Sequence, residues 1–263
     1  MLDYKQKFCT TDIYEYNVSI GKKMGSSLRV TTFTALRKPG FELAEPNNIN
    51  YVSKCSKNDF KLSTNISRAR SKVHEYAACN DWEYFCTFTI SKEKCNRYDL
   101  KEFYNSFSKF INNYNERRLP AGMKVSYLLI PEKHEDGAWH LHGFVSGINP
   151  DDIYINQNGY LVWKQYDEKF GYISMDKIRD LDRCANYILK YVTKNLDKSV
   201  KDQECHLYYC SKGLKRAEVI FKEVNMDLGM PYDYESEDGL IKIKTFYNFF
   251  NKEGKNEINW SKR

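Results

Sequence analysis

The sequence predicts an α+β domain with a central antiparallel sheet and flanking helices, and three patterns indicate this fold class. Aromatic and β-branched residues fill 82–90, which is typical of a buried strand. Residues 124–134 and 139–145 flank a turn and are expected to form a hairpin. From Asp99 to Tyr114 the apolar residues recur at spacings of three and four, as on one face of a helix. Strands interleaved with helices favour an α+β sheet domain.

Other segments extend this plan. Further helices are expected at 66–79 and 180–196. Further strands are expected at 30–36, 171–175, 206–211 and 240–246. The first 65 residues otherwise show little recognisable pattern, and the chain ends in a polar segment.

The composition excludes several classes of protein. Hydrophobic residues make up 41% of the 263 residues, which is enough for a core but too few for a membrane protein. No apolar stretch approaches the roughly 20 residues of a membrane-spanning helix, so we expect a cytoplasmic protein with no membrane partner. The eight cysteines include no CxxC pair, which argues against a disulfide framework. The net charge of +6 suits a polyanionic partner better than an acidic one.

Two histidines in the second strand of the hairpin form a candidate metal site. Residues two apart in a strand point to the same face, so His140 and His142 would present two imidazoles side by side. Trp139, Leu141 and Val145 would point to the other face, into the core. Two neutral imidazoles are good ligands for a divalent metal. On this pattern alone, a pair of ordinary surface histidines explains the sequence equally well.

The turn before these histidines decides whether a carboxylate joins them. A three-residue loop at 135–137, with its glycine in the left-handed conformation, places Glu132 opposite His140. Glu132, His140 and His142 would then share one face. A two-residue loop would instead place Lys133 opposite His140, where its charge would repel a cation. We favour the three-residue loop.

The expected helix at 180–196 carries a second candidate site. At roughly 100° per residue, two tyrosines and two lysines fall within one arc of its surface. They are Tyr187, Lys190, Tyr191 and Lys194. Apolar residues that would pack on the sheet fall on a different face: Leu181, Ala185, Ile188 and Val192. The polar arc is either a reactive face or an exposed face with extended lysines.

Three motifs in this order resemble those of the HUH endonucleases, and are most similar to phage and plasmid rolling-circle replication initiators. They are Phe85-x-Thr87-x-Thr89, His140-Leu141-His142 and the doubled Tyr187-x-x-Lys190-Tyr191-x-x-Lys194. The resemblance covers about residues 66–220 and implies an RRM-like or ferredoxin-like core. It implies an endonuclease domain at 66–225 between an N-terminal extension (1–65) and a C-terminal extension (226–263). The side chains of the first motif are otherwise best interpreted as a core strand that supports the hairpin.

The resemblance also implies a reaction. Mg²⁺ or Mn²⁺ bound by Glu132, His140 and His142 would polarise a phosphate, and Tyr187 or Tyr191 would attack it. The products would be a 5′-phosphotyrosine and a free 3′-hydroxyl on single-stranded origin DNA, with Lys190 and Lys194 stabilising charge. His134 lies on the face of Glu132 in either register, as a fourth ligand or an ordinary surface histidine. Candidate DNA-binding residues are Arg68, Arg70, Lys72, Lys212, Lys215 and Arg216.

Partners and alternatives follow from the same motifs. The chain contains no GxxxxGK[ST] phosphate loop, so a host helicase would unwind the DNA and a host polymerase would extend the 3′-hydroxyl. An HUH transposase or relaxase shares the chemistry, although the paired tyrosines argue against a single-tyrosine transposase. A DNA-binding regulator without cleavage would show no metal dependence. An unrelated zinc hydrolase has no HExxH motif to support it.

Overall fold

The computed structural model describes residues 14–37, 59–194, 206–236 and 239–250, and the structural statements below concern these residues. The chain divides into two compact units. One comprises Lys54–Arg216, and the other combines Met1–Ser53 with Ala217–Arg263. The structure has two antiparallel sheets and four α-helices, which confirms the predicted α+β class.

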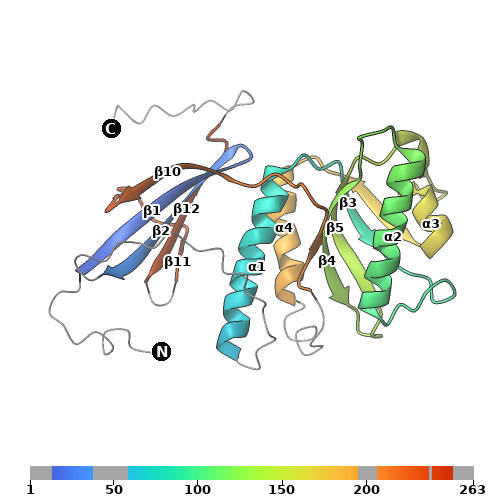
Figure 1. Cartoon of the computed structure of the whole chain (residues 1–263), viewed down its shortest axis with the longest axis horizontal. Coiled ribbons are helices and arrows are strands. Elements are labelled where there is room, and N and C mark those ends of the chain that lie inside the picture. Colours follow the sequence, from blue (N-terminus) through green and yellow to red (C-terminus); the bar gives the residue numbers. More distant parts are fainter. Residues whose placement is uncertain (1–13, 38–58, 195–205, 237–238, 251–263) are drawn as a thin grey trace. The chain divides into compact units, whose positions relative to one another are not determined.

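The larger unit is built on a seven-stranded antiparallel sheet of order β6-β7-β8-β3-β5-β4-β9 (Figure 1). Its strands are β3 (Tyr84–Phe88), β4 (Ser126–Lys133), β5 (Trp139–Ser146), β6 (Ile153–Ile155), β7 (Leu161–Trp163), β8 (Ile173–Lys177) and β9 (Tyr209–Cys210). The strands expected at 82–90, 124–134, 139–145, 171–175 and 206–211 are confirmed, with small differences at their ends. The predicted hairpin is β4 and β5, and β5 lies between β4 and β3.

Helices cover both faces of this sheet (Figure 1). α2 (Leu100–Arg118) and α3 (Lys164–Phe170) pack on one face, and α1 (Asp59–Cys79) and α4 (Leu181–Lys194) pack on the other. The helices expected at 66–79 and from Asp99 are confirmed, and the one at 180–196 is confirmed up to 194, because 195–196 lie outside the described residues. α3 does not follow from the sequence, since seven residues are too few to show a helical period.

The face under α2 holds the larger core. Asp99 caps α2, because its side chain accepts a hydrogen bond of 2.9 Å from the backbone N–H of Glu102. The buried residues of α2 are Leu100, Phe103, Phe107, Phe110, Ile111 and Tyr114. They pack with a sheet face that includes Trp139, Leu141 and Val145, as predicted. Each large apolar side chain buried here contributes about 1.5–3 kcal/mol to folding.

The opposite face of the hairpin changes from apolar to polar along its strands. Leu128 and Ile130 of β4 and Phe144 of β5 are fully buried in the core beneath α1 and α4. Because side chains alternate between the two faces of a strand, the next residues on this face are Glu132 on β4 and His142 on β5. The face covered by α1 and α4 therefore ends in a polar patch.

Gly143 allows β4 and β5 to pair closely at this point. It directly follows His142, and it pairs with Leu129 on β4 and with Cys86 on β3. A Cβ atom on this residue would collide with the backbone carbonyl of Leu128. The obstacle is main chain and cannot turn aside, so any larger residue would push apart the two strands that carry the histidines and the carboxylate.

The smaller unit is a five-stranded antiparallel sheet of order β10-β1-β2-β12-β11. Its strands are β1 (Tyr14–Met24), β2 (Ser27–Arg37), β10 (Glu218–Val224), β11 (Tyr234–Glu235) and β12 (Ile241–Phe246). Its buried core consists of Leu28, Val30, Leu228, Phe249 and Phe250. The strands expected at 30–36 and 240–246 are confirmed as parts of β2 and β12.

Both ends of the chain contribute to this smaller sheet. β1 pairs with β10, and β2 pairs with β12. The domains proposed from the sequence (1–65, 66–225 and 226–263) follow one another in linear order, so they differ from the compact units in that respect. The proposed division stays a prediction.

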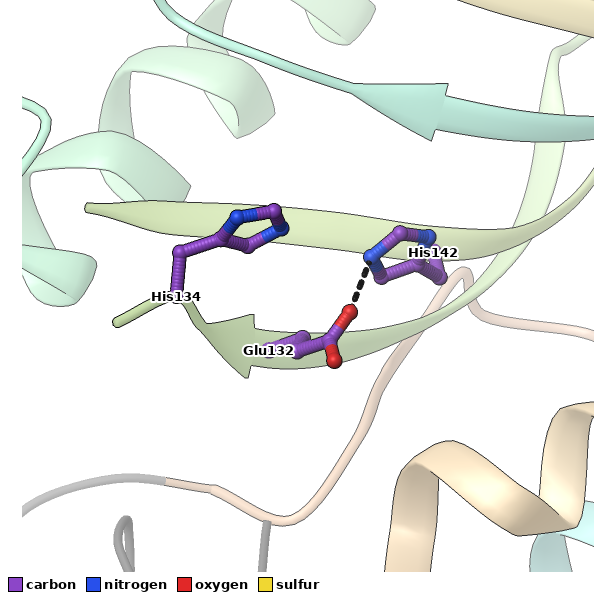
Figure 2. A group of neighbouring side chains, drawn as sticks. All are labelled: Glu132, His134 and His142. Atoms are coloured by element: carbon purple, nitrogen blue, oxygen red, sulfur yellow. Dashed lines mark ion pairs between the residues drawn. The ribbon is translucent and has the colours of Figure 1, made fainter. Parts of the chain in front are cut away.

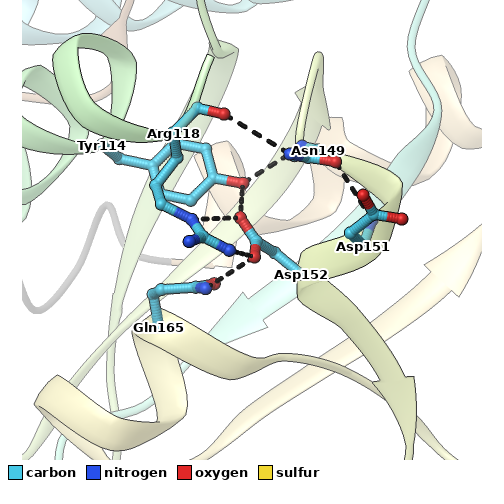
Figure 3. Close-up of polar contacts among 6 residues, drawn as sticks. All are labelled: Tyr114, Arg118, Asn149, Asp151, Asp152 and Gln165. Atoms are coloured by element: carbon cyan, nitrogen blue, oxygen red, sulfur yellow. Dashed lines mark hydrogen bonds and ion pairs between the residues drawn. The ribbon is translucent and has the colours of Figure 1, made fainter.

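A buried carboxylate ties the loop after β5 to α2 and α3 (Figure 3). Asp152 accepts hydrogen bonds from the Tyr114 hydroxyl at 2.6 Å, the Gln165 amide at 2.7 Å and Arg118 Nε at 3.1 Å. The backbone N–H of Asn149 donates to the Tyr114 hydroxyl at 3.1 Å. Burial opposes ionisation of Asp152, but the hydrogen bonds together outweigh it and lower the pKa of this carboxyl.

Asp152→Asn should lower the free energy of unfolding at pH 7 by roughly 2–4 kcal/mol, because it removes a buried charge that Arg118 pairs with. The pKa of Asp152 is lower in the folded than in the unfolded chain. Its ionisation therefore stabilises the fold above the unfolded value of about 3.9, and this contribution is lost as the pH falls through the folded value. Urea unfolding at neutral and acidic pH measures both effects.

The matched control is Asp151→Asn, which changes the exposed neighbour and should leave stability unaltered. The gap between wild type and Asp152→Asn should narrow in acid. A gap of the same size at both pH values would contradict the assigned role of the Asp152 charge.

Candidate metal and tyrosine site

The β4–β5 turn has the three-residue form predicted from the sequence. Gly137 has a φ of 86°, in the left-handed region, and the backbone N–H of His134 donates to the carbonyl of Ala138 at 2.9 Å. Glu132 consequently pairs with His140. The two-residue alternative is wrong, because Lys133 pairs with Trp139 and not with His140.

Three possible ligand side chains converge at this end of the hairpin. Figure 2 shows Glu132, His134 and His142 turned toward one another. One ligand atom from each lies within 4.8 Å of the others. Glu132 Oε2 lies 2.7 Å from His142 Nε2, and both side chains are buried. A carboxylate and two imidazoles are a donor set that suits a divalent first-row metal.

His140 lies in the same row of rings but outside that group of three. Its ring stacks on His134, with centroids 3.9 Å apart and planes at 17°. Its centroid is 6.2 Å from that of His142. The structure thus places His134, proposed from the sequence only as a fourth ligand or a surface residue, at least as close to Glu132 and His142 as the predicted ligand His140.

Both histidines of the motif favour the neutral form. Burial lowers the pKa of His142, and the neighbouring Glu132 opposes this without outweighing it. Burial and then the nearby His134 lower the pKa of His140. Among the described residues, His142 Nε2 has no hydrogen-bond partner of suitable geometry, although the Glu132 oxygen is so near. A cation shared by this nitrogen and this oxygen would satisfy both, so the residues fit a metal ion.

α4 brings both tyrosines of the third motif to this patch. Ala185, Ile188 and Val192 are buried against the sheet, as predicted. The ring of Tyr191 stacks on the ring of His142, with centroids 4.3 Å apart and planes at 13°. The hydroxyls of Tyr187 and Tyr191 lie 2.9 Å apart.

The phenol nearest the histidines is held protonated. Burial raises the pKa of Tyr191, and its hydrogen bond with Tyr187 raises it further. A neutral phenol is a weak nucleophile, so attack by Tyr191 needs a group that stabilises the developing negative charge. A metal ion at the neighbouring imidazoles would do this.

The two predicted lysines differ in what the structure shows. Lys190 Nζ lies 5.1 Å from the ring centroid of Tyr187, so this ammonium group is close to one of the phenols. Lys194 is the last residue of α4, but its side chain lies outside what the structure describes.

The six basic residues proposed to bind DNA are not equivalent. Arg68, Arg70 and Lys212 are exposed. The others contact acidic or aromatic side chains: Lys215 and Asp81 at 3.0 Å, Arg216 and Glu75 at 3.1 Å, and Lys72 over the ring of Tyr76 at 5.6 Å. DNA would have to compete for the charges of Lys215 and Arg216.

Two residues of the first motif also contact the histidines, which the sequence does not reveal. Thr87 Oγ1 lies 3.1 Å from His142 Nδ1, and Thr89 Oγ1 lies 3.1 Å from His140 Nδ1. Their alternation with the buried Cys86 is the available sequence pattern. Threonine is common in any strand, so that pattern alone does not identify a role.

An α+β sandwich whose hairpin gathers a carboxylate and imidazoles beside two phenols has the groups needed for metal-assisted phosphodiester chemistry. Residues 83–196, from β3 to the end of α4, match a family of replication-associated proteins of the ORF2 type. This match confirms the resemblance to rolling-circle replication initiators and implies that the protein binds DNA. No curated protein sequence and no solved structure matches the chain. None of the described helices is both long and apolar enough to cross a membrane.

Glu132→Gln and His142→Asn should each weaken Mn²⁺ binding by at least tenfold, roughly the loss that even outer-shell partners of a metal site cause. Titration of the metal-free protein with Mn²⁺, followed by electron paramagnetic resonance, measures the affinity. His206→Asn, which changes an exposed histidine outside the cluster, should bind like wild type.

The same titration distinguishes the two remaining imidazoles. We expect His140→Asn to weaken binding more than His134→Asn, because the His140 Nδ1 contact with Thr89 leaves Nε2 for a cation. The reverse order would replace His140 by His134 in the ligand set.

Proposed function

We propose that this protein nicks single-stranded origin DNA by metal-assisted tyrosine transesterification and thereby starts rolling-circle replication of a phage or plasmid. The stacking of Tyr191 on His142, within a site that also holds Glu132, is the observation that carries the proposal. It places a nucleophile beside candidate ligands, in a segment that matches replication-associated proteins.

Mg²⁺ or Mn²⁺, when bound by Glu132, His140 and His142, would supply Lewis-acid polarisation of a phosphate oxygen. The phenolic oxygen of Tyr191 attacks the phosphorus and loses its proton. The bond from phosphorus to the 3′-oxygen breaks, and that oxygen takes up a proton to become a free 3′-hydroxyl. The DNA 5′ end stays on the protein as a phosphotyrosine.

One phosphodiester is exchanged for another, so the bond energy is conserved and the same site can rejoin ends without ATP. A host polymerase would extend the 3′-hydroxyl and a host helicase would unwind the template, in the cytoplasm. The contact of Tyr191 with His142 favours it as the first nucleophile. Tyr187, one turn away with its hydroxyl 2.9 Å from that of Tyr191, would act in the later joining step. Lys190 and Lys194 would stabilise the charge on the phenolates or the phosphate.

Incubation with Mn²⁺ and a labelled random-sequence library of single-stranded DNA should produce a protein–DNA adduct that survives denaturation. Sequencing the adducts would identify the cleaved site. Tyr191→Phe should reduce initial nicking at least about 100-fold, since it removes the attacking oxygen while keeping the ring. Tyr187→Phe should retain initial nicking and lose joining.

Tyr172→Phe is a matched control at an exposed tyrosine outside α4, and its activity should be unchanged. Cleavage that survives in the Tyr187→Phe/Tyr191→Phe double variant would reject the tyrosine mechanism. Binding of DNA without any adduct in the wild type would favour a non-cleaving regulator.

Exposed basic residues of α1 should contribute to holding the strand. Arg68→Gln/Arg70→Gln should weaken binding to all single-stranded sequences and reduce the slope of log affinity against log salt by about 0.7 for each phosphate that is no longer neutralised. Lys215→Gln/Arg216→Gln should change the slope less, because these side chains already pair with Asp81 and Glu75. Fluorescence anisotropy at several salt concentrations measures both, and equal slopes for the two variants would contradict this ranking.

A further inference from the structure

We propose that Thr87 and Thr89 of β3 are positioning residues that aim the imidazoles of His142 and His140 at the metal ion. The proposal rests on the metal site of the proposed function. It assigns a role to the first motif, whose side chains are otherwise explained only as part of a strand.

The register of the sheet brings each hydroxyl to its own histidine. β3 runs antiparallel to β5, and Thr87 pairs directly with His142. Thr87 Oγ1 lies 3.1 Å from His142 Nδ1, and Thr89 Oγ1 lies 3.1 Å from His140 Nδ1. The same contact thus occurs twice, two residues apart on each strand, so it follows from the strand pairing and not from one chance rotamer.

Neighbouring residues hold the threonines on this face. Cys86 and Phe88, on either side of Thr87, are fully buried in the core under α2 and α3. A shift of β3 by one residue would bring these two side chains out of the core, which prevents it. Thr87 and Thr89 therefore stay on the face that bears the histidines.

The chemistry of imidazole explains why this contact matters for a metal ion. A neutral histidine has one N–H and one lone pair, so a metal bound at Nε2 requires the proton on Nδ1. A threonine hydroxyl can accept that N–H, and its rotation also lets it donate to an unprotonated Nδ1. Thr87 and Thr89 can thus satisfy Nδ1 before and after metal binding, while they keep Nε2 turned away from β3. Outer partners of this kind typically change metal affinity 10–100-fold.

Thr87→Val and Thr89→Val test the proposal, because valine keeps the shape and strand preference of threonine but removes the hydroxyl. Mn²⁺ binding to the full chain without DNA should weaken about 10-fold or more in each variant. Thr87→Ser and Thr89→Ser should restore most of the affinity, since they return the hydroxyl. Ser174→Ala is the matched control, because Ser174 pairs with Thr87 from β8, on the side away from the hairpin.

A second measurement does not depend on the metal. The ¹⁵N chemical shift of the histidine Nδ1 reports the loss of its hydrogen-bond partner. Thr87→Val should move the Nδ1 signal of His142 only, and Thr89→Val should move that of His140 only. A merely structural role of the threonines would not produce this one-to-one correspondence.

The outcomes separate the two proposals. Valine variants with wild-type Mn²⁺ affinity and unchanged imidazole shifts would overturn the role of the threonines and leave the proposed nicking activity intact. A wild-type protein that binds no Mn²⁺ would instead remove the metal site, and with it the proposed mechanism.

Discussion

The pairing of Glu132 with His140 across the β4–β5 turn fixes the position of every other group in the candidate site. Side chains alternate with a period of two, so a slip of one residue would send the carboxylate to the opposite face of the sheet. The turn is braced against such a slip. The carboxylate of Asp136 accepts a hydrogen bond of 3.1 Å from the backbone N–H of Ala138 and pairs with Arg97 at 2.8 Å. One local geometry therefore determines which residues can act together.

The helix that carries the phenols is positioned by a different constraint. Ile188 and Val192 are buried against the apolar part of the same sheet face, where Ile130 is also buried. Tyr191 is the residue before Val192, so it points about 100° away from the buried stripe of α4. That direction leads to the polar end of the hairpin and the ring of His142. The change from apolar to polar along β4 and β5 thus sets where the tyrosines meet the imidazoles.

Much of the larger unit could be predicted from the sequence, because its information is local. The helical period of α2, the glycine of the turn and the apolar stripe of α4 each depend on neighbouring residues. The smaller sheet could not be predicted, since β1 pairs with β10 from the far end of the chain. The hydrogen bonds of Asp152 join a loop to two helices, and the Thr87–His142 contact joins β3 to β5. Contacts of this kind depend on packing, which no spacing of residues reveals.

The charges of the site explain why its parts belong together. At neutral pH the lowered pKa keeps His142 uncharged, and the raised pKa keeps Tyr191 protonated. The short approach of Glu132 to His142 then joins two electron-rich atoms, an arrangement that is costly in a buried place unless a cation or proton lies between them. Attack by a phenol creates further negative charge within the same few ångströms. A divalent cation would compensate both, so the groups that make the resting site electrostatically unfavourable are the groups that make a metal-loaded site able to cleave a phosphodiester.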